Sequence, residues 1–142
     1  NFLKKLKMIE LIKRYSKAYE NLNESNIEKV LNCVSKDLIF IDPFNEIKGK
    51  DKFEKLFLEM FKKIKKPKFK ILNLSDGKKL FYIKWAFSGV YIKSFIMEGV
   101  SEIHIKNNLI TKHIDYWDSG KNFYCNIPML GKVFKKIHKI AN

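Results

Sequence analysis

The hydrophobic periodicity of this chain changes near Pro67 from mainly helical to mainly strand-like, and this change constrains the fold most strongly. Before it, apolar residues recur every three or four positions, which is typical of helices that bury one face. After it, the sequence reads as strands over residues 68–74, 79–87, 94–106 and 109–118, rich in β-branched and aromatic residues. Helices followed by a run of strands predict an α+β domain.

Three helices and one strand are predicted before the change. The first helix covers residues 2–22, and its apolar stripe consists of Leu6, Ile9, Ile12, Tyr15, Tyr19 and Leu22. Ser25 and Glu28 have the spacing of a capping box, which predicts a second, short helix ending near residue 34. A strand over 38–42 ends before Pro43, and a third helix begins after Gly49 and stops before Pro67.

Turn residues order the later strands. Asp76-Gly77 and Asn107-Asn108 tolerate the backbone of tight hairpins, so their flanking strands are expected to be antiparallel. Gly99, inside the strand over 94–106, predicts a bulge or bend that curves the sheet. A short basic amphipathic helix is predicted over 132–140, where it covers an open edge or mouth of the domain or docks on an anionic membrane surface.

Composition bounds the class of protein. A chain of 142 residues with 46% apolar residues is expected to form one domain, residues 1–142, around one core. Its apolar runs are too short for a membrane span or a secretory signal, so we predict a soluble, cytoplasmic protein. Cys33 and Cys125 belong to no C-x-x-C or Cys/His pattern, and both are predicted to be free thiols rather than zinc ligands.

The net charge of +14 would ordinarily suggest nucleic acid or an anionic membrane as a partner. Arg14 is the sole arginine, however, and the lysines are spread over nearly every segment. Specific recognition of bases and phosphates favours arginine. We therefore expect no specific nucleic-acid partner, and only weak, salt-sensitive binding to polyanions.

Three local patterns strengthen a resemblance to a known fold. They are Phe40-Ile41-Asp42-Pro43 followed by Gly49 and a helix, the pair Gly99 and Ser101, and the segment from Leu109 to Asp118. With the order of elements, they make the chain similar to the nuclear transport factor 2-like, or SnoaL-like, superfamily. The resemblance implies a cone-shaped fold in which a curved, mainly antiparallel sheet wraps around three helices, with a short C-terminal helix. Its relatives include isomerases, cyclases, epoxide hydrolases and noncatalytic binders.

The resemblance also implies functional positions. Compared with steroid isomerases, Asp42 lies at the position of the proton-transferring base and Tyr15 lies close to that of the oxyanion-stabilising tyrosine. Ser101 stands where the second acid is expected. Compared with limonene epoxide hydrolases, Asp115 matches an acid, but Lys84-Trp85-Ala86 stands in place of the Arg-x-Asp segment. Asp118 has a spacing compatible with the acid of polyketide cyclases.

A regular last strand would place four residues on one face, Thr111, His113, Asp115 and Trp117. Ile110, Ile114 and Tyr116 would occupy the other face, and the family analogy points the first set into the cone. His113 and Asp115 then form either a proton-transfer pair or a structural polar ladder. Asp42 is either a base or a carboxylate that ties down its own loop.

These inferences predict a protein that binds a small apolar molecule and acts as an acid/base isomerase, cyclase or hydratase. The predicted catalytic residues are Asp42, His113 and Asp115. The predicted ligand-binding residues are Tyr15, Phe57, Trp85, Met97, Ser101 and Trp117. No metal or cofactor is implied, and a homodimer formed through the outer sheet face is expected. The alternative is a noncatalytic ligand carrier or a dimeric protein-interaction module.

Overall fold

The computed structural model describes residues 1–77 and 79–118. Within them, the helices are α1 (Phe2–Glu20), α2 (Glu28–Leu31) and α3 (Lys50–Lys63). The strands are β1 (Val34–Ile41), β2 (Glu46–Lys48), β3 (Lys65–Asp76), β4 (Phe81–Tyr91), β5 (Lys93–Lys106) and β6 (Leu109–Trp117).

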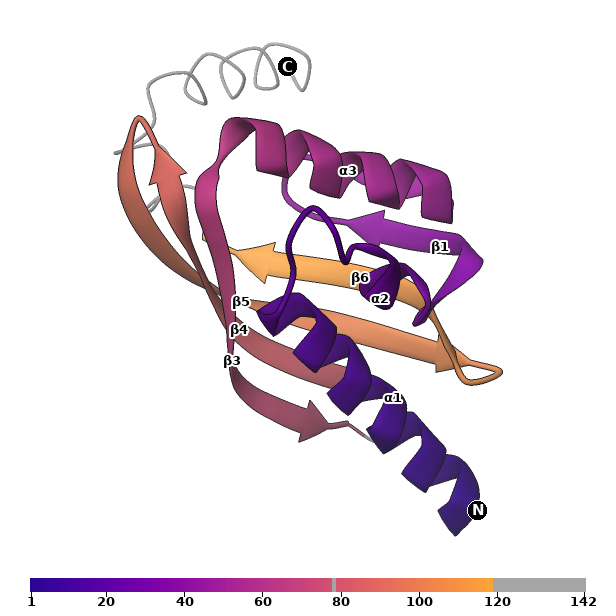
Figure 1. The fold of residues 1–142 in the computed structure, drawn as a ribbon. Helices are drawn as coiled ribbons and strands as arrows, with labels where there is room; N and C mark the ends of the chain where they lie inside the picture. The colour runs from indigo at the N-terminus through magenta and orange to yellow at the C-terminus, as the bar shows by residue number, and fades with distance from the viewer. Residues whose placement is uncertain (78, 119–142) are drawn as a thin grey trace, which may run out of the picture.

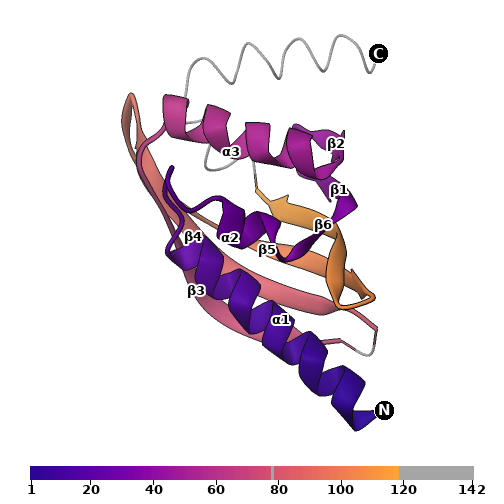
Figure 2. The same cartoon turned by 45° about the vertical axis from the view of Figure 1, so that its right-hand side comes forward.

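The strands form one sheet in the order β2-β1-β6-β5-β4-β3. All neighbouring pairs are antiparallel except β1 and β6, which run parallel. The sheet is strongly curved and does not close, and α1, α2 and α3 all lie on its concave side (Figure 1). Figure 2 shows the same arrangement from a second direction. The predicted α+β class and the curved, mainly antiparallel sheet around three helices are confirmed.

The core lies between the helices and the concave face. Helix α3 contributes Phe53 and Phe57, which are 0% and 4% exposed, and burying a phenylalanine side chain stabilises a fold by about 1.5–3 kcal/mol. Helix α1 contributes Leu11, Ile12 and Tyr15, all buried. Helix α3 contacts β1, β2 and β3, and α1 also contacts β3, so both helices pack against the β3 side of the sheet and α3 alone extends to β1 and β2 among these contacts.

Several predicted boundaries were wrong. The second helix is one turn long and has no side-chain cap, because the Ser25 hydroxyl donates to the Asn23 side chain 2.6 Å away instead of capping the helix. Strand β1 begins at Val34 rather than at residue 38. Strand β2 was not predicted, and β4 extends four residues beyond its predicted end at residue 87.

The predictions for Gly99 and for Ile110 also need correction. Gly99 makes no bulge, because the β4–β5 register is continuous through the Trp85–Gly99 pair. A Cβ at Gly99 would lie 2.4 Å from the Trp85 ring, so this glycine makes room for the indole.

The irregularity in the β5–β6 pairing lies between His104 and Ile105, where Thr111 is the extra residue. Ile110, predicted on the outer face, is therefore turned inward and is fully buried.

Two predictions fall outside the described residues: the C-terminal helix and the state of Cys125. Cys33 is a free thiol, buried against the core. No helix in the described ranges is long and apolar enough to cross a membrane.

Candidate functional site

A cavity of about 620 Å³ lies between α1, α3 and the concave face of the sheet. Its wall is mainly aromatic and aliphatic, with residues such as Phe40, Phe53, Ile83, Phe87 and Phe95. All nine residues predicted to form the site lie on this wall: Asp42, His113, Asp115, Tyr15, Phe57, Trp85, Met97, Ser101 and Trp117. The volume is in the range of sites for small organic molecules.

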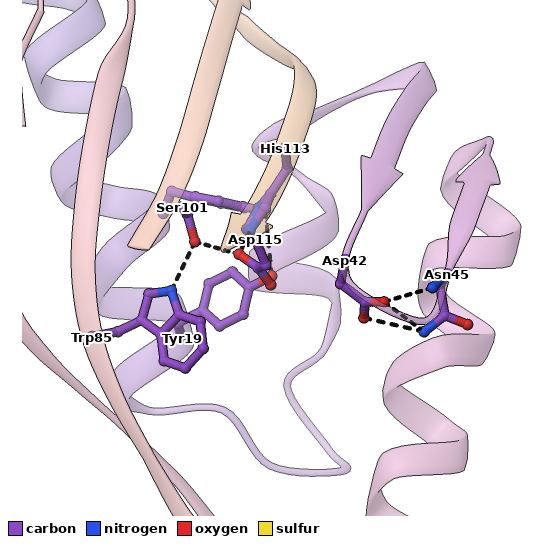
Figure 3. Close-up of polar contacts among 8 residues, drawn as sticks. Tyr19, Asp42, Asn45, Trp85, Ser101, His113 and Asp115 are labelled. Atoms are coloured by element: carbon purple, nitrogen blue, oxygen red, sulfur yellow. Dashed lines mark hydrogen bonds and ion pairs between the residues drawn. The ribbon is translucent and has the colours of Figure 1, made fainter. Parts of the chain in front are cut away.

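Polar side chains from three neighbouring strands meet on the cavity wall (Figure 3). Strand pairing places Ser101 of β5 directly opposite Asp115 of β6, and the Ser101 hydroxyl donates to Asp115 Oδ1 at 2.5 Å. Trp85 of β4 donates its indole N–H to Ser101 Oγ at 2.9 Å. Because an indole N–H can only donate, it leaves the serine hydrogen free for the carboxylate.

His113 extends this network to α1. Its Nε2 lies 2.6 Å from Asp115 Oδ1, and its Nδ1 lies 2.8 Å from the Tyr15 hydroxyl. With Asp115 ionised and His113 neutral, the Nε2–H donates to the carboxylate and Nδ1 accepts from Tyr15. The Tyr19 hydroxyl lies 3.4 Å from that of Tyr15. A chain of hydrogen-bonding groups thus runs from the sheet to α1.

The two tyrosines remain protonated at ordinary pH. Burial is the main cause that raises the pKa of Tyr15 and of Tyr19 well above the usual value, and the nearby Asp115 charge acts in the same direction. Both phenols therefore keep the hydrogens that this chain requires. Removing the proton of a phenol here would place a second negative charge beside Asp115.

Asp42 lies on the same wall but is engaged with its own loop. Its Oδ1 accepts hydrogen bonds from the backbone N–H groups of Phe44 and Asn45, at 2.8 and 2.6 Å, and from the Asn45 side chain. Figure 3 shows Asp42 paired with Asn45 and apart from the Ser101–Asp115 group. Among the described residues, Asp42 makes no direct hydrogen bond to His113 or Asp115. Burial raises the pKa of Asp42, the Asp115 charge adds to the rise, and the loop hydrogen bonds oppose it.

The raised pKa of Asp42 predicts a pH-dependent contribution to stability. Between the ordinary carboxyl pKa and the raised one, the folded protein binds more protons than the unfolded chain, so stability falls as the pH rises through this interval. Asp42→Asn should remove this decline. Thermal unfolding of both proteins from about pH 4 to pH 7 measures it. Asp37→Asn, at an exposed aspartate of β1, is the control, and a constant difference between wild type and Asp42→Asn would contradict the prediction.

Two residues of α1, Ser16 and Tyr19, line the cavity although they were not predicted to do so. Tyr19 follows Tyr15 by four positions and therefore shares its helix face, a spacing that could have identified it. Ser16 is 5% exposed, and its hydroxyl has no hydrogen-bond partner among the described residues. No group of three or more His, Cys, Asp or Glu side chains in the described chain is arranged to hold a metal ion.

The sequence profile of the SnoaL-like domain family matches residues 15–113. The chain belongs to this family. No protein of curated function matches the chain.

Solved structures share the SnoaL-like fold at low sequence identity. An LEH-like epoxide hydrolase from M. tuberculosis is 16% identical with a TM-score of 0.68, covering 83% of this chain and 87% of that one. A putative polyketide cyclase from Xanthomonas campestris is 12% identical with a TM-score of 0.68, covering 80% and 91%. A protein from Catenulispora acidiphila with a ketosteroid isomerase-like fold, solved with trimethylamine, is 13% identical with a TM-score of 0.66, covering 75% and 84%. At these identities the likeness shows the fold alone.

Proposed function

We propose that this SnoaL-like protein binds a small apolar molecule in its cavity and transfers protons to and from it. The observation that carries this proposal is the hydrogen bonding of the two carboxylate oxygens of Asp115. Two donors hold its Oδ1, while its Oδ2 accepts no hydrogen bond from any described residue. The side chain is 18% exposed and lies on the cavity wall. An oriented carboxylate with one free oxygen, facing an apolar chamber, is suited to accept a proton from a bound molecule.

Two of the three carboxyl groups that line the cavity, those of Asp115 and Asp42, have different surroundings. Asp115 receives hydrogen bonds from Ser101 and His113 at Oδ1 alone, so its Oδ2 remains open to a bound molecule. Asp42 has a pKa raised mainly by burial, which favours its neutral, proton-donating form. Carboxyl groups whose environments differ in this way can act as base and acid. In our proposal Asp115 takes the proton and Asp42 returns one to the substrate.

Three classes of known chemistry narrow the substrates to be tested. The fold neighbours are described as an LEH-like epoxide hydrolase, a putative polyketide cyclase and a hypothetical protein with a ketosteroid isomerase-like fold. Each reaction class moves a proton on a largely apolar substrate. We therefore expect a ligand of this kind to raise the melting temperature of the protein, because binding to the folded state alone stabilises it.

A thermal-shift screen tests the binding step. Its panel contains a β,γ-unsaturated ketosteroid, limonene epoxide and an anthraquinone carboxylic ester, followed by product analysis for each. A shift that rises with ligand concentration, together with turnover of one member, supports the proposal. Binding without turnover in either the wild type or Asp42→Asn would instead support a ligand carrier. A matched variant, Phe57→Trp, narrows the cavity and should weaken binding if the ligand occupies it.

We further propose that the protein is a homodimer paired through the convex face of the sheet. Ile96 and Tyr116 are 70% and 55% exposed and lie on the strand faces opposite the cavity wall. Pairing two such faces would remove apolar groups from water. Light scattering should give about twice the 16.9 kDa chain mass at micromolar concentration. Tyr116→Lys should shift the distribution toward the monomer, and a wild-type protein that is monomeric throughout would refute the proposal.

A further inference from the structure

Positive charge borders the cavity along α3. Lys52, Lys55 and Lys63 are exposed residues of this helix and also line the cavity. Their spacing of three and eight positions places them on one stripe of the helix. No ion pair engages any of the three in the described part of the chain. Their ammonium groups are therefore available to a bound molecule.

The acidic residues of α3 leave this charge uncancelled. Glu59 is the one acid of the helix that lines the cavity, and it pairs with Lys62 at 3.2 Å. Asp51 and Glu54 do not belong to the cavity wall. A negative group at the cavity would therefore meet three lysines and one already-paired glutamate on the α3 side.

The other walls would not hold an anion. Besides Glu59, the carboxyl groups on the cavity wall belong to Asp115 and Asp42, and Asp115 lies on the sheet. A carboxylate placed against Asp115 would experience like-charge repulsion in a chamber lined mostly by aromatic and aliphatic side chains. The remaining wall offers apolar surface, which suits the body of a ligand. The charges thus define an orientation for an elongated molecule.

We infer that the cavity takes an amphipathic anion, with a carboxylate or similar group against Lys52, Lys55 and Lys63 and an uncharged end against Asp115. This inference rests on the proposed binding function and adds one negatively charged group to the otherwise apolar ligand. The lysines are exposed, so each ion pair contributes modestly and is screened by salt. Three together are expected to give an anion about a tenfold preference over its neutral counterpart at low ionic strength.

Pyrenebutyrate and pyrenebutanol provide a matched pair of probes that differ in one charged group. The chain has two tryptophans, Trp85 and Trp117, and both line the cavity. Energy transfer from tryptophan to pyrene therefore reports binding near the cavity. The full chain is titrated with each probe at low and at physiological salt, which separates charge from apolar contact.

Two triple variants with equal loss of charge locate the preference. The first changes Lys52, Lys55 and Lys63 to glutamine. The second changes Lys13, Lys17 and Lys29 to glutamine. These are exposed lysines of α1 and α2 that do not line the cavity. We expect the first variant to bind both probes within about twofold of each other, with pyrenebutanol affinity unchanged, and the second to keep most of the preference.

The outcomes separate this inference from the proposed function. Equal affinity of the wild type for the two probes would overturn the anion inference, but it would still support ligand binding in the cavity. An equal loss of preference in both triple variants would also overturn it, because net charge alone would then explain the effect. No energy transfer with either probe would count against ligand binding in the cavity, and so against the proposed function as well.

Discussion

Asp115→Asn should lower turnover by about 10²–10⁴-fold on whichever panel substrate the wild type converts. Asparagine can keep its carbonyl oxygen toward Ser101 and His113, the two groups that hold Oδ1. It replaces the free carboxylate oxygen with an N–H₂ group, which donates and cannot accept a proton. The shape of the cavity is therefore expected to remain while the base is lost.

The measurement compares kcat/KM with the affinity for the same ligand. Because the variant removes proton transfer rather than contact, its affinity should change by less than about threefold. Glu102→Gln is the matched control, since Glu102 lies on the other face of β5 and pairs with His104 at 2.7 Å. Turnover retained within about twofold in Asp115→Asn would contradict the role of base, and an equal loss in the control would indicate a general effect of charge.

Strand alternation was enough to predict which residues of β6 line the site, but not the register in which β6 pairs with β5. Residues two apart on a strand face the same side, so Thr111, His113, Asp115 and Trp117 were grouped from the sequence. The last three line the cavity, whereas Thr111 does not. The Asn107-Asn108 turn, with both φ values positive, also formed as predicted. From that turn alone, however, continuous pairing would place Ser101 opposite Ile114.

The extra residue at Thr111 changes this pairing. It shifts β6 by one position, so that Ser101 pairs with Asp115 and Ile103 pairs with His113. A bulge of this kind cannot be read from the hydrophobic pattern, because its position depends on the pairing of the two strands and on their packing against the core. The sequence therefore predicted the polar residues of the site correctly without predicting the hydrogen bond between Ser101 and Asp115.

Other differences arise from turns whose residues carry no turn signal. Strands β4 and β5 are joined at Ile92, which has a φ of 63° although it is β-branched. No glycine or asparagine marks this turn, so the end of β4 could not be located. Strand β2 has three residues, too few for a period, and is defined by its pairing with β1. Asp42 stays in its own loop because Phe44 and Asn45 supply nearer donors than the far wall.

Ser16→Ala and Ser101→Ala should change stability in opposite directions. Both serines are buried, at 5% and 2% exposure. The Ser16 hydroxyl has no hydrogen-bond partner among the described residues, whereas Ser101 accepts from Trp85 and donates to Asp115. A buried hydroxyl without a hydrogen-bond partner lowers the free energy of unfolding by about 1–3 kcal/mol. Alanine at position 16 removes that cost and favours the helix, so we expect a gain of about 1 kcal/mol.

Ser101→Ala should instead destabilise the protein by about 1–3 kcal/mol, because it leaves the Trp85 N–H without an acceptor and takes a donor from Asp115. The two variants lose the same atom, so the difference in unfolding free energy, about 2–4 kcal/mol, isolates the effect of hydrogen bonding. Urea unfolding followed by tryptophan fluorescence measures it, with unchanged m values as the check on two-state behaviour. Ser94→Ala, at an exposed position of β5, should have little effect. If Ser16→Ala destabilises as much as Ser101→Ala, the Ser16 hydroxyl must contribute to the folded state, and its lack of a partner cannot be a cost.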